Sequence, residues 1–249
     1  MLSTLWTAVD GYASTYYLWD DWGGTWADAD KTSQIDEDDK MCWAAAASNI
    51  LEWTGWGNVV GDTDQIFEYF QDKWSNAGGL SYYGWQWWFT GDNYHQGDTG
   101  WAQETENGGG FWSSEYDFDN FIAFTSNDEY AMNWAAFFLE NGYGTVLSLT
   151  NDITDAKHAI TLWGYGVDDS NIWIEITDSD DRFYGLSQYS ISQTSDRWEL
   201  QYYNNEDGWY ISSVQGLAAS PAPEPSNFFL FGLALITGAG FLRRAEQVT

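Results

Sequence analysis

Hydrophobic positions follow a helical pattern in the first half of the chain and a strand-like pattern in the second half. The clearest helical segment is Cys42–Trp53, in which a run of alanines has high helix propensity and Gly55 and Gly57 provide stop signals. Asp38 and Asp39 stand just before it, where negative charge suits a helix N-terminus. The sequence therefore predicts a helix that begins at Cys42.

Two further helices and a group of strands are predicted along the rest of the chain. The helices are expected from Asp64 to Trp74 and from Glu129 to Glu140, whereas residues 77–118 are rich in Gly, Trp, Tyr and Asp and are expected to form loops with short strands. β-branched or aromatic stretches separated by turn residues predict strands at Thr145–Thr150, Ala159–Tyr165, Ile172–Thr177, Trp198–Tyr203 and Trp209–Ser213. Helices first and strands later predict an α+β domain with an antiparallel sheet.

The chain divides into four segments by composition. Residues 1–30 lack clear periodicity and are expected to form an extended lead-in, and residues 31–217 form the predicted domain. Residues 218–226 form a linker that contains all three prolines of the chain, and residues 227–249 are a hydrophobic tail with a basic end.

Composition excludes global disorder, because 44% of the 249 residues are hydrophobic and 19% are aromatic. The charge is strongly negative, with 38 acidic residues against eight basic ones and a formal net charge of −30. Binding to nucleic acid or directly to an anionic membrane needs clustered Lys and Arg, so both are disfavoured. We interpret the acidity as a solubility feature.

The tail has three elements in order: Pro223-Glu224-Pro225, an apolar run from Phe228 to Leu242, and the pair Arg243-Arg244. The apolar run is shorter than the roughly 20 residues of a full membrane span. The pattern resembles the PEP-CTERM sorting signal of Gram-negative bacteria, which implies export and a sorting enzyme of the exosortase type as a partner. An ordinary single-pass tail anchor is the alternative.

Both interpretations of the tail put residues 1–220 outside the cytoplasm, with membrane contact only through the tail before it is processed. The N-terminus shows no signal peptide, because it lacks a basic region and Asp10 interrupts any apolar core. Since an exported protein is expected to carry one, we expect the true start to lie upstream.

Cys42 is the only cysteine of the chain, so an intramolecular disulfide is impossible. At the start of a helix, backbone N–H groups and the helix dipole favour the thiolate and can hold a developing oxyanion. The alternative is a buried cysteine that serves packing alone.

A nucleophilic thiol needs a base, and the chain has two histidines. His158 begins a predicted strand, whereas His95 lies in a polar segment and is expected to be a surface residue. The strand that ends at Thr177 is followed by Asp178, Ser179, Asp180 and Asp181. If the two strands are antiparallel neighbours, one of these carboxylates can orient the imidazole, although a solvated turn is the alternative.

Three blocks together resemble the IdeS/Mac-type cysteine endopeptidases of the papain-like clan. They are Asp38-Asp39-Lys40-Met41-Cys42 with its small-residue helix, His158-Ala159-Ile160-Thr161-Leu162-Trp163-Gly164, and Thr177-Asp178-Ser179-Asp180. The resemblance implies a papain-like α+β fold, with an N-terminal helical part whose nucleophile helix packs on a C-terminal antiparallel sheet. It also implies hydrolysis of a protein or peptide substrate without a cofactor or metal.

The resemblance also assigns roles to individual residues. Cys42 is the nucleophile, His158 the general base, and Asp178 the orienting carboxylate, with Asp180 as a supporting or alternative partner. The family uses a lysine upstream of the cysteine for the oxyanion; Lys31 is the candidate here, and Gln34 is the alternative.

Two other signals compete with this interpretation. Residues 28–39 half-match an EF-hand loop, but Ser33 replaces the turn glycine, so a solvated acidic loop is favoured over calcium binding. The aromatic run 82–89 is either a stacking platform or core. An extracellular carbohydrate-binding or structural surface protein is therefore the alternative function. The substrate stays open, although the acidity predicts basic or neutral target segments.

Overall fold

The computed structural model describes residues 14–32, 38–74, 76–91, 108–126, 128–168, 171–180 and 183–221. Its centre is an antiparallel barrel in which six strands pair in the closed order β4-β3-β8-β7-β6-β5, with β5 returning to β4. Two further strands extend the barrel, because β1 pairs with β4 and β2 pairs with β8. The strands are β1 Ser14–Tyr17, β2 Ile122–Thr125, β3 Tyr143–Asn151, β4 Lys157–Val167, β5 Ile172–Thr177, β6 Ser187–Gln193, β7 Trp198–Leu200 and β8 Trp209–Ala218.

The predicted papain-like α+β fold, with a helical N-terminal part packed on a C-terminal sheet, is wrong. The closed six-stranded barrel with its two added strands dominates the fold, which is mainly β with few helices. The physical reason lies in β6, which the sequence prediction missed because its segment is mostly polar. Without β6, no path of strands connects β5 to β7, and the ring cannot close.

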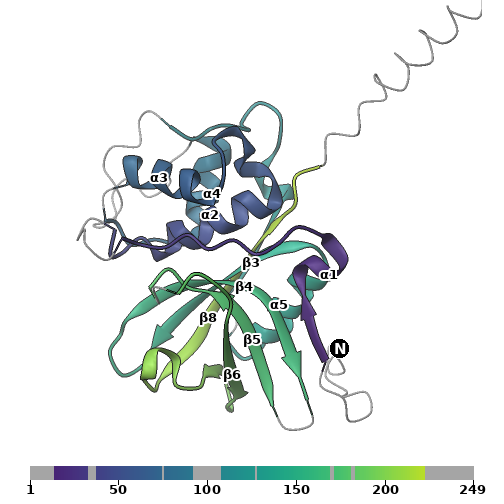
Figure 1. Cartoon of the computed structure of the whole chain (residues 1–249), viewed down its shortest axis with the longest axis vertical. Helices are drawn as coiled ribbons and strands as arrows, with labels where there is room; N and C mark the ends of the chain where they lie inside the picture. Colours follow the sequence, from purple (N-terminus) through teal and green to yellow (C-terminus); the bar gives the residue numbers. More distant parts are fainter. Residues whose placement is uncertain are drawn as a thin grey trace, which may run out of the picture. The chain divides into compact units, whose positions relative to one another are not determined.

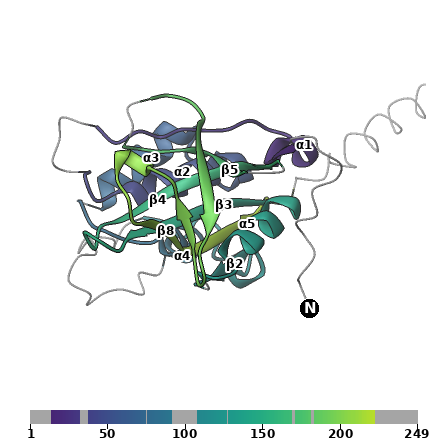
Figure 2. The same ribbon diagram turned by 90° about the horizontal axis from the view of Figure 1, so that it is seen from below.

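Four of the helices have clear roles in packing. Helix α2 (Cys42–Thr54) lies against the barrel wall at β3 and β4, α3 (Thr63–Lys73) and α4 (Ser81–Thr90) pack on α2, and α5 (Ala131–Glu140) covers β3 and β8. Figure 1 shows α2, α3 and α4 as one helical layer beside the barrel, and Figure 2 shows α5 against its side. The short α1 (Leu18–Trp22) follows β1.

The helices expected near residues 42–53, 64–74 and 129–140 are confirmed, with bounds shifted by a few residues. Helix α4 was predicted as loop. Its sequence Ser-Tyr-Tyr-Gly-Trp-Gln-Trp-Trp-Phe-Thr has aromatic residues on all sides, and burial in the core rather than helix propensity accounts for the helix.

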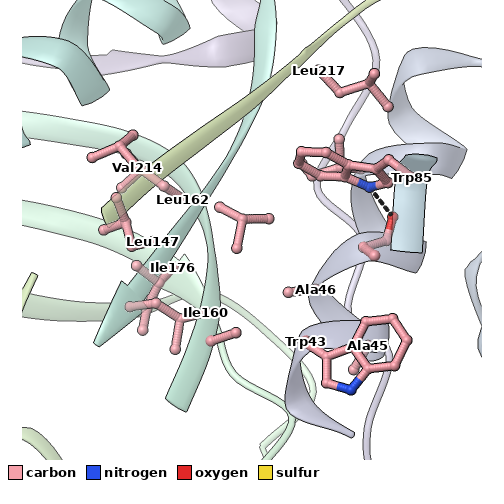
Figure 3. Packing of buried hydrophobic residues seen from close by; sticks show 14 of the residues in the cluster. Trp43, Ala45, Ala46, Trp85, Leu147, Ile160, Leu162, Ile176, Val214 and Leu217 are labelled. Atoms are coloured by element: carbon pink, nitrogen blue, oxygen red, sulfur yellow. Dashed lines mark hydrogen bonds between the residues drawn. The ribbon is translucent and has the colours of Figure 1, made fainter. Parts of the chain in front are cut away.

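The barrel wall has two different faces. On its inner face the cross-strand pairs are aliphatic, for example Leu147 opposite Ile160. The face toward the helical layer carries polar residues such as Thr161, which bonds to helix α2 through Asn49. Figure 3 shows the aliphatic cluster among the strands and the Trp and Ala side chains of the helical layer beside it.

Residues 23–32 form an extended segment that runs between the helical layer and the barrel (purple in Figure 1). Its backbone bonds to both sides, since Ala29 N–H donates to Asn49 Oδ1 at 2.8 Å and Ala27 O accepts from the Thr177 hydroxyl at 2.9 Å. This segment delivers Lys31 to the end of strand β5, where Lys31 N–H bonds to Ser179 O at 3.1 Å.

The chain divides into two units, Met1–Ala219 and Ser220–Thr249. The Pro-Glu-Pro motif, the apolar run and the arginine pair of the predicted sorting signal lie outside the described residues. Among the residues that the structure describes, no helix has both the length and the apolar character needed to cross a membrane.

Candidate active site

The thiol of Cys42 lies at the first position of helix α2 and is half-buried. The turn before it is fixed by Asp38, whose backbone carbonyl accepts from Met41 N–H at 2.8 Å. The Asp38 carboxylate is 2% exposed and accepts hydrogen bonds from Thr32 and Gln71. A buried acidic side chain thus ties the loop to helix α3 and sets where the helix begins.

His158 and Asp178 meet because of the strand register. His158 pairs with Leu149 and shares the inner face of β4 with Ile160, two residues on. Asp178 follows β5 directly and has the same parity as Ile176, which pairs with Leu162 on that face. Since side chains alternate along a strand, both residues point into the same mouth of the barrel.

The contacts at this mouth form a chain of three groups. The Cys42 thiol interacts electrostatically with the His158 imidazole and with the backbone N–H of Ala159. On the other side of the ring, His158 Nε2 lies 2.7 Å from Asp178 Oδ1. Because the carboxylate engages Nε2, Nδ1 is the ring nitrogen left for proton exchange with the thiol.

These contacts shift the protonation of Cys42 and His158 in opposite directions. Burial raises the pKa of the Cys42 thiol, but the charge of His158, its hydrogen bond and the Lys31 ammonium outweigh burial and hold that pKa below its ordinary value. Burial lowers the pKa of His158, but the Cys42 charge and the hydrogen bond to Asp178 hold it well above its ordinary value. Both shifts favour the thiolate–imidazolium form of the pair.

Asp178 stays ionised in spite of its burial. Burial raises the pKa of this carboxyl, but the hydrogen bond from His158, the imidazole charge and the hydrogen bonds from Tyr203 and the Asp180 backbone outweigh it, so the pKa lies below its ordinary value. The Asp180 N–H donates to Asp178 Oδ1 at 3.0 Å. Both oxygens of the carboxylate are therefore engaged.

Tyr203 is a site residue that the sequence prediction missed. Its hydroxyl donates to Asp178 Oδ2, and its ring centroid lies 6.1 Å from that of His158. Burial and the neighbouring carboxylate raise the pKa of Tyr203 well above its ordinary value, so it remains a donor. Tyr203 lies in the short helix η4 (Tyr203–Asn205), where Tyr202 and Asn204 have left-handed φ values of 53°. The only signal in the sequence was the Asn-Asn doublet, which tolerates that conformation.

Lys31 and Asp180 also lie at the site. Lys31 Nζ is 2.5 Å from Asp180 Oδ1 and donates to Asp39 O at 2.6 Å. The other oxygen of Asp180 is 3.7 Å from His158 Nδ1, the ring nitrogen that does not bond to Asp178. Asp178 therefore holds the hydrogen bond to Nε2, and Asp180 links the imidazole to the lysine.

Asn49 connects the two parts that carry the site. Its amide nitrogen donates to Thr161 and Thr177 on the barrel, at 3.0 Å and 3.3 Å. Its Oδ1 accepts from Ala29 N–H and from the Thr63 hydroxyl, each at 2.8 Å. The side chain is buried, so this network fixes helix α2 relative to strands β4 and β5 and hence the thiol relative to the imidazole.

His158, Asp178 and Asp180 also have ligand atoms close enough together to surround a metal ion, all within 4.8 Å. The contacts favour a proton-transfer site instead, because the His158 and Asp178 ligand atoms bond to each other at 2.7 Å. The ammonium of Lys31 against Asp180 would also repel a cation.

The remaining candidates fall elsewhere. Gln34 and His95 lie outside the described residues. In the EF-hand-like segment, Asp28 is buried and accepts from Gly185 N–H at 2.9 Å, so this part of the segment is not the solvated loop that was predicted. In the aromatic run, the side chains most suited to stacking are core residues of helix α4, namely Trp85, Trp87, Trp88 and Phe89.

Comparison with known proteins adds no family assignment: no family model matches the chain, and a search of curated proteins finds no significant match.

Proposed function

We propose that this protein is an exported cysteine endopeptidase that hydrolyses peptide bonds through Cys42, His158 and Asp178. The observation that carries the proposal is the contact chain at the barrel mouth. A thiol at a helix N-terminus interacts electrostatically with a buried imidazole, whose Nε2 lies 2.7 Å from a buried carboxylate. Nucleophile, base and orienting group in this order are the requirement for acyl transfer by a thiol.

In the acylation step, the Cys42 thiolate attacks the carbonyl carbon of the scissile peptide bond and a C–S bond forms. The backbone N–H of Cys42 and the Lys31 ammonium are the candidate donors to the oxyanion. An ammonium has three hydrogens, and Asp39 O and Asp180 account for two acceptors of Lys31. As the C–N bond breaks, His158 Nδ1 transfers its proton to the leaving amine.

In the deacylation step, neutral His158 takes a proton from water, and the resulting hydroxide attacks the thioester carbonyl. The C–S bond breaks, the carboxylic acid product leaves, and the thiolate–imidazolium pair is restored. Asp178 keeps the ring oriented and stabilises its charge in both steps. No cofactor or metal enters the reaction.

The resemblance of three sequence blocks to the IdeS/Mac-type endopeptidases supports the same roles for Cys42, His158 and Asp178. The PEP-CTERM-like tail supports the proposed export, an extracellular or cell-envelope location, and an exosortase-type enzyme as partner. The substrates of the members that define that family are not carried over to this peptidase.

The decisive experiment compares the wild-type protein with Cys42→Ala on an unfolded protein substrate, with and without a metal chelator. We expect hydrolysis by the wild type, no hydrolysis by Cys42→Ala, and no effect of the chelator. Lys157→Ala serves as a control, since Lys157 is exposed and adjoins His158 in sequence. Residual activity in Cys42→Ala, or loss of activity with the chelator, would contradict the proposal.

A further inference from the structure

Three chain connections surround the mouth of the barrel at which the candidate site lies. They are residues 152–156 between β3 and β4, residues 178–186 between β5 and β6, and residues 201–208 between β7 and β8. In an antiparallel barrel, the chain reverses direction at each connection, so every second connection along the chain lies at the same end of the barrel. His158 follows the first of them, Asp178 begins the second, and Tyr203 belongs to the third.

Hydrogen bonds join these connections to one another. Asp152 N–H donates to Gly208 O at 3.0 Å, and Asn151 Nδ2 donates to Asp207 O at 3.0 Å, so the first connection lies against the third. Tyr203 donates to Asp178, so the third lies against the second. The three connections thus form one continuous border around the site.

The first and third connections each expose one large hydrophobic side chain, and the second exposes two, because Phe183 is 56% exposed beside Tyr184. Ile153 is 72% exposed, Tyr202 71% and Tyr184 70%, and these are the highest values among the large hydrophobic residues that stand exposed in the described part of the chain. Tyr184 extends the group toward the segment before Lys31, since its ring lies 5.2 Å from that of Trp26. We call Ile153, Tyr184 and Tyr202 the mouth rim. They stand on connections at the same end of the barrel, and exposed apolar side chains that share one face are a feature of binding surfaces.

The charged residues around the mouth rim are mainly acidic. Asp155, Glu206 and Asp207 are exposed on the same connections, and Asp180 stands partly exposed at the site itself. Among the described residues at this border, two are basic: Lys157 is exposed, and the half-buried Arg197 pairs with Asp152 at 2.6 Å. Such a surface attracts polypeptide segments that carry positive charge.

We propose that the mouth rim is the substrate-binding surface of the peptidase, and that it takes unfolded polypeptide segments in which aromatic or aliphatic residues stand beside Lys or Arg. This inference rests on the proposed function, because it places the scissile bond at Cys42. The apolar rim side chains receive the hydrophobic residues of the substrate, and the acidic border receives the basic ones.

The test uses three synthetic peptides: one with aromatic and lysine residues, one with serine in place of the aromatic residues, and one with glutamate in place of lysine. The kcat/KM for cleavage of each peptide is measured with the wild type and with the rim variant, which carries Ile153→Ser, Tyr184→Ser and Tyr202→Ser. The matched control is Val59→Ser, Phe124→Ser, Phe137→Ser, which removes exposed hydrophobic residues from other parts of the fold.

We expect the wild type to prefer the aromatic–lysine peptide, and the rim variant to lose about tenfold or more in kcat/KM for it, mainly through KM, while the control variant does not. The rate at which iodoacetamide labels Cys42 should be equal in all three proteins. Equal kcat/KM in the rim and control variants, or a preference for the glutamate peptide, would overturn the inference.

Failure of the proposed function has a different signature, in which no peptide is cleaved and Cys42 is labelled slowly. Peptide binding to Cys42→Ala, compared with the same variant carrying the rim substitutions, then decides the inference alone. Peptide binding that is lost with the rim substitutions supports a peptide-binding surface at the mouth rim. No peptide binding, or equal binding with and without the rim substitutions, contradicts it.

Discussion

The helical layer and the mouth of the barrel are both densely buried, but they use buried polar atoms in different ways. In the helical layer, indole N–H groups donate to backbone carbonyls, as Trp43 does to Ala77 at 2.7 Å and Trp88 to Trp56 at 3.1 Å. At the mouth, the buried polar atoms belong to ionisable groups that bond to one another, such as His158 and Asp178. Neutral donors in the first region fix packing, whereas linked charges in the second region fix protonation.

This difference has a consequence for substitutions in each region. Removal of a core aromatic side chain leaves a cavity and lowers stability without altering any charge. Removal of one member of the linked group leaves the others buried and incompletely paired, so protonation and reactivity change first. Substitutions in the helical layer are therefore expected to change the free energy of unfolding, and substitutions at the mouth to change protonation and reactivity.

Asp178→Asn is expected to give the largest effect on catalysis. The neutral amide cannot stabilise the imidazolium of His158, so kcat/KM should fall by about 10²–10⁴-fold. The measurement is peptide hydrolysis together with a thermal unfolding curve that establishes how much of the protein is folded. Activity within a few fold of the wild type would remove Asp178 from the mechanism.

Trp88→Ala tests the role of the helical layer in stability. Trp88 is fully buried among Tyr69, Phe70 and Phe111, so its loss should lower the free energy of unfolding by about 3–5 kcal/mol. Urea unfolding measures this change. The pH dependence of Cys42 alkylation in the folded variant should match the wild type, and a shifted dependence would show that the two regions are coupled.

Tyr203→Phe should give a smaller effect that sharpens the role of the third connection. The phenylalanine keeps the ring but removes the donor to Asp178, so we expect about a tenfold loss of kcat/KM. Tyr130→Phe is the matched control, because its side chain is exposed and precedes helix α5, outside the mouth rim. Equal losses in the two variants would argue against a positioning role for Tyr203.

Tyr203→Phe is also expected to change the pH at which stability and activity are lost in acid. The pKa of Asp178 is depressed in the fold, so its contribution to stability is present above the unfolded pKa and disappears as the pH falls through the folded one. Loss of the Tyr203 donor raises the folded pKa. The acid loss of stability and activity should therefore begin at a higher pH in Tyr203→Phe than in the wild type.

The sequence was sufficient to predict Cys42 at a helix start and His158 and Asp178 at strand ends. These predictions rest on local signals, namely an alanine run, β-branched or aromatic stretches and a turn of acidic residues. Barrel closure was not predictable in the same way, because it depends on pairings between distant strands and on the weakly hydrophobic strand β6.

Helix α4 and Tyr203 show why the remaining features were missed. Helix α4 depends on tertiary contact: a Cβ atom at Gly84 would lie only 2.7 Å from the Trp43 ring, so the glycine permits the close approach of α2. Tyr203 reaches Asp178 across 25 residues through a turn with left-handed backbone. Neither property follows from local propensity or periodicity.

The central claim is that Cys42 exists as a thiolate paired with an imidazolium. Because Cys42 is the only cysteine, the rate of iodoacetamide incorporation into the intact protein reports on this thiol alone. The claim predicts rapid labelling that stays nearly constant from about pH 6 to about pH 8 and a slower, alkaline-dependent rate in His158→Ala. A wild-type rate that rises about tenfold per pH unit toward an ordinary thiol pKa of about 8.5 would contradict the account.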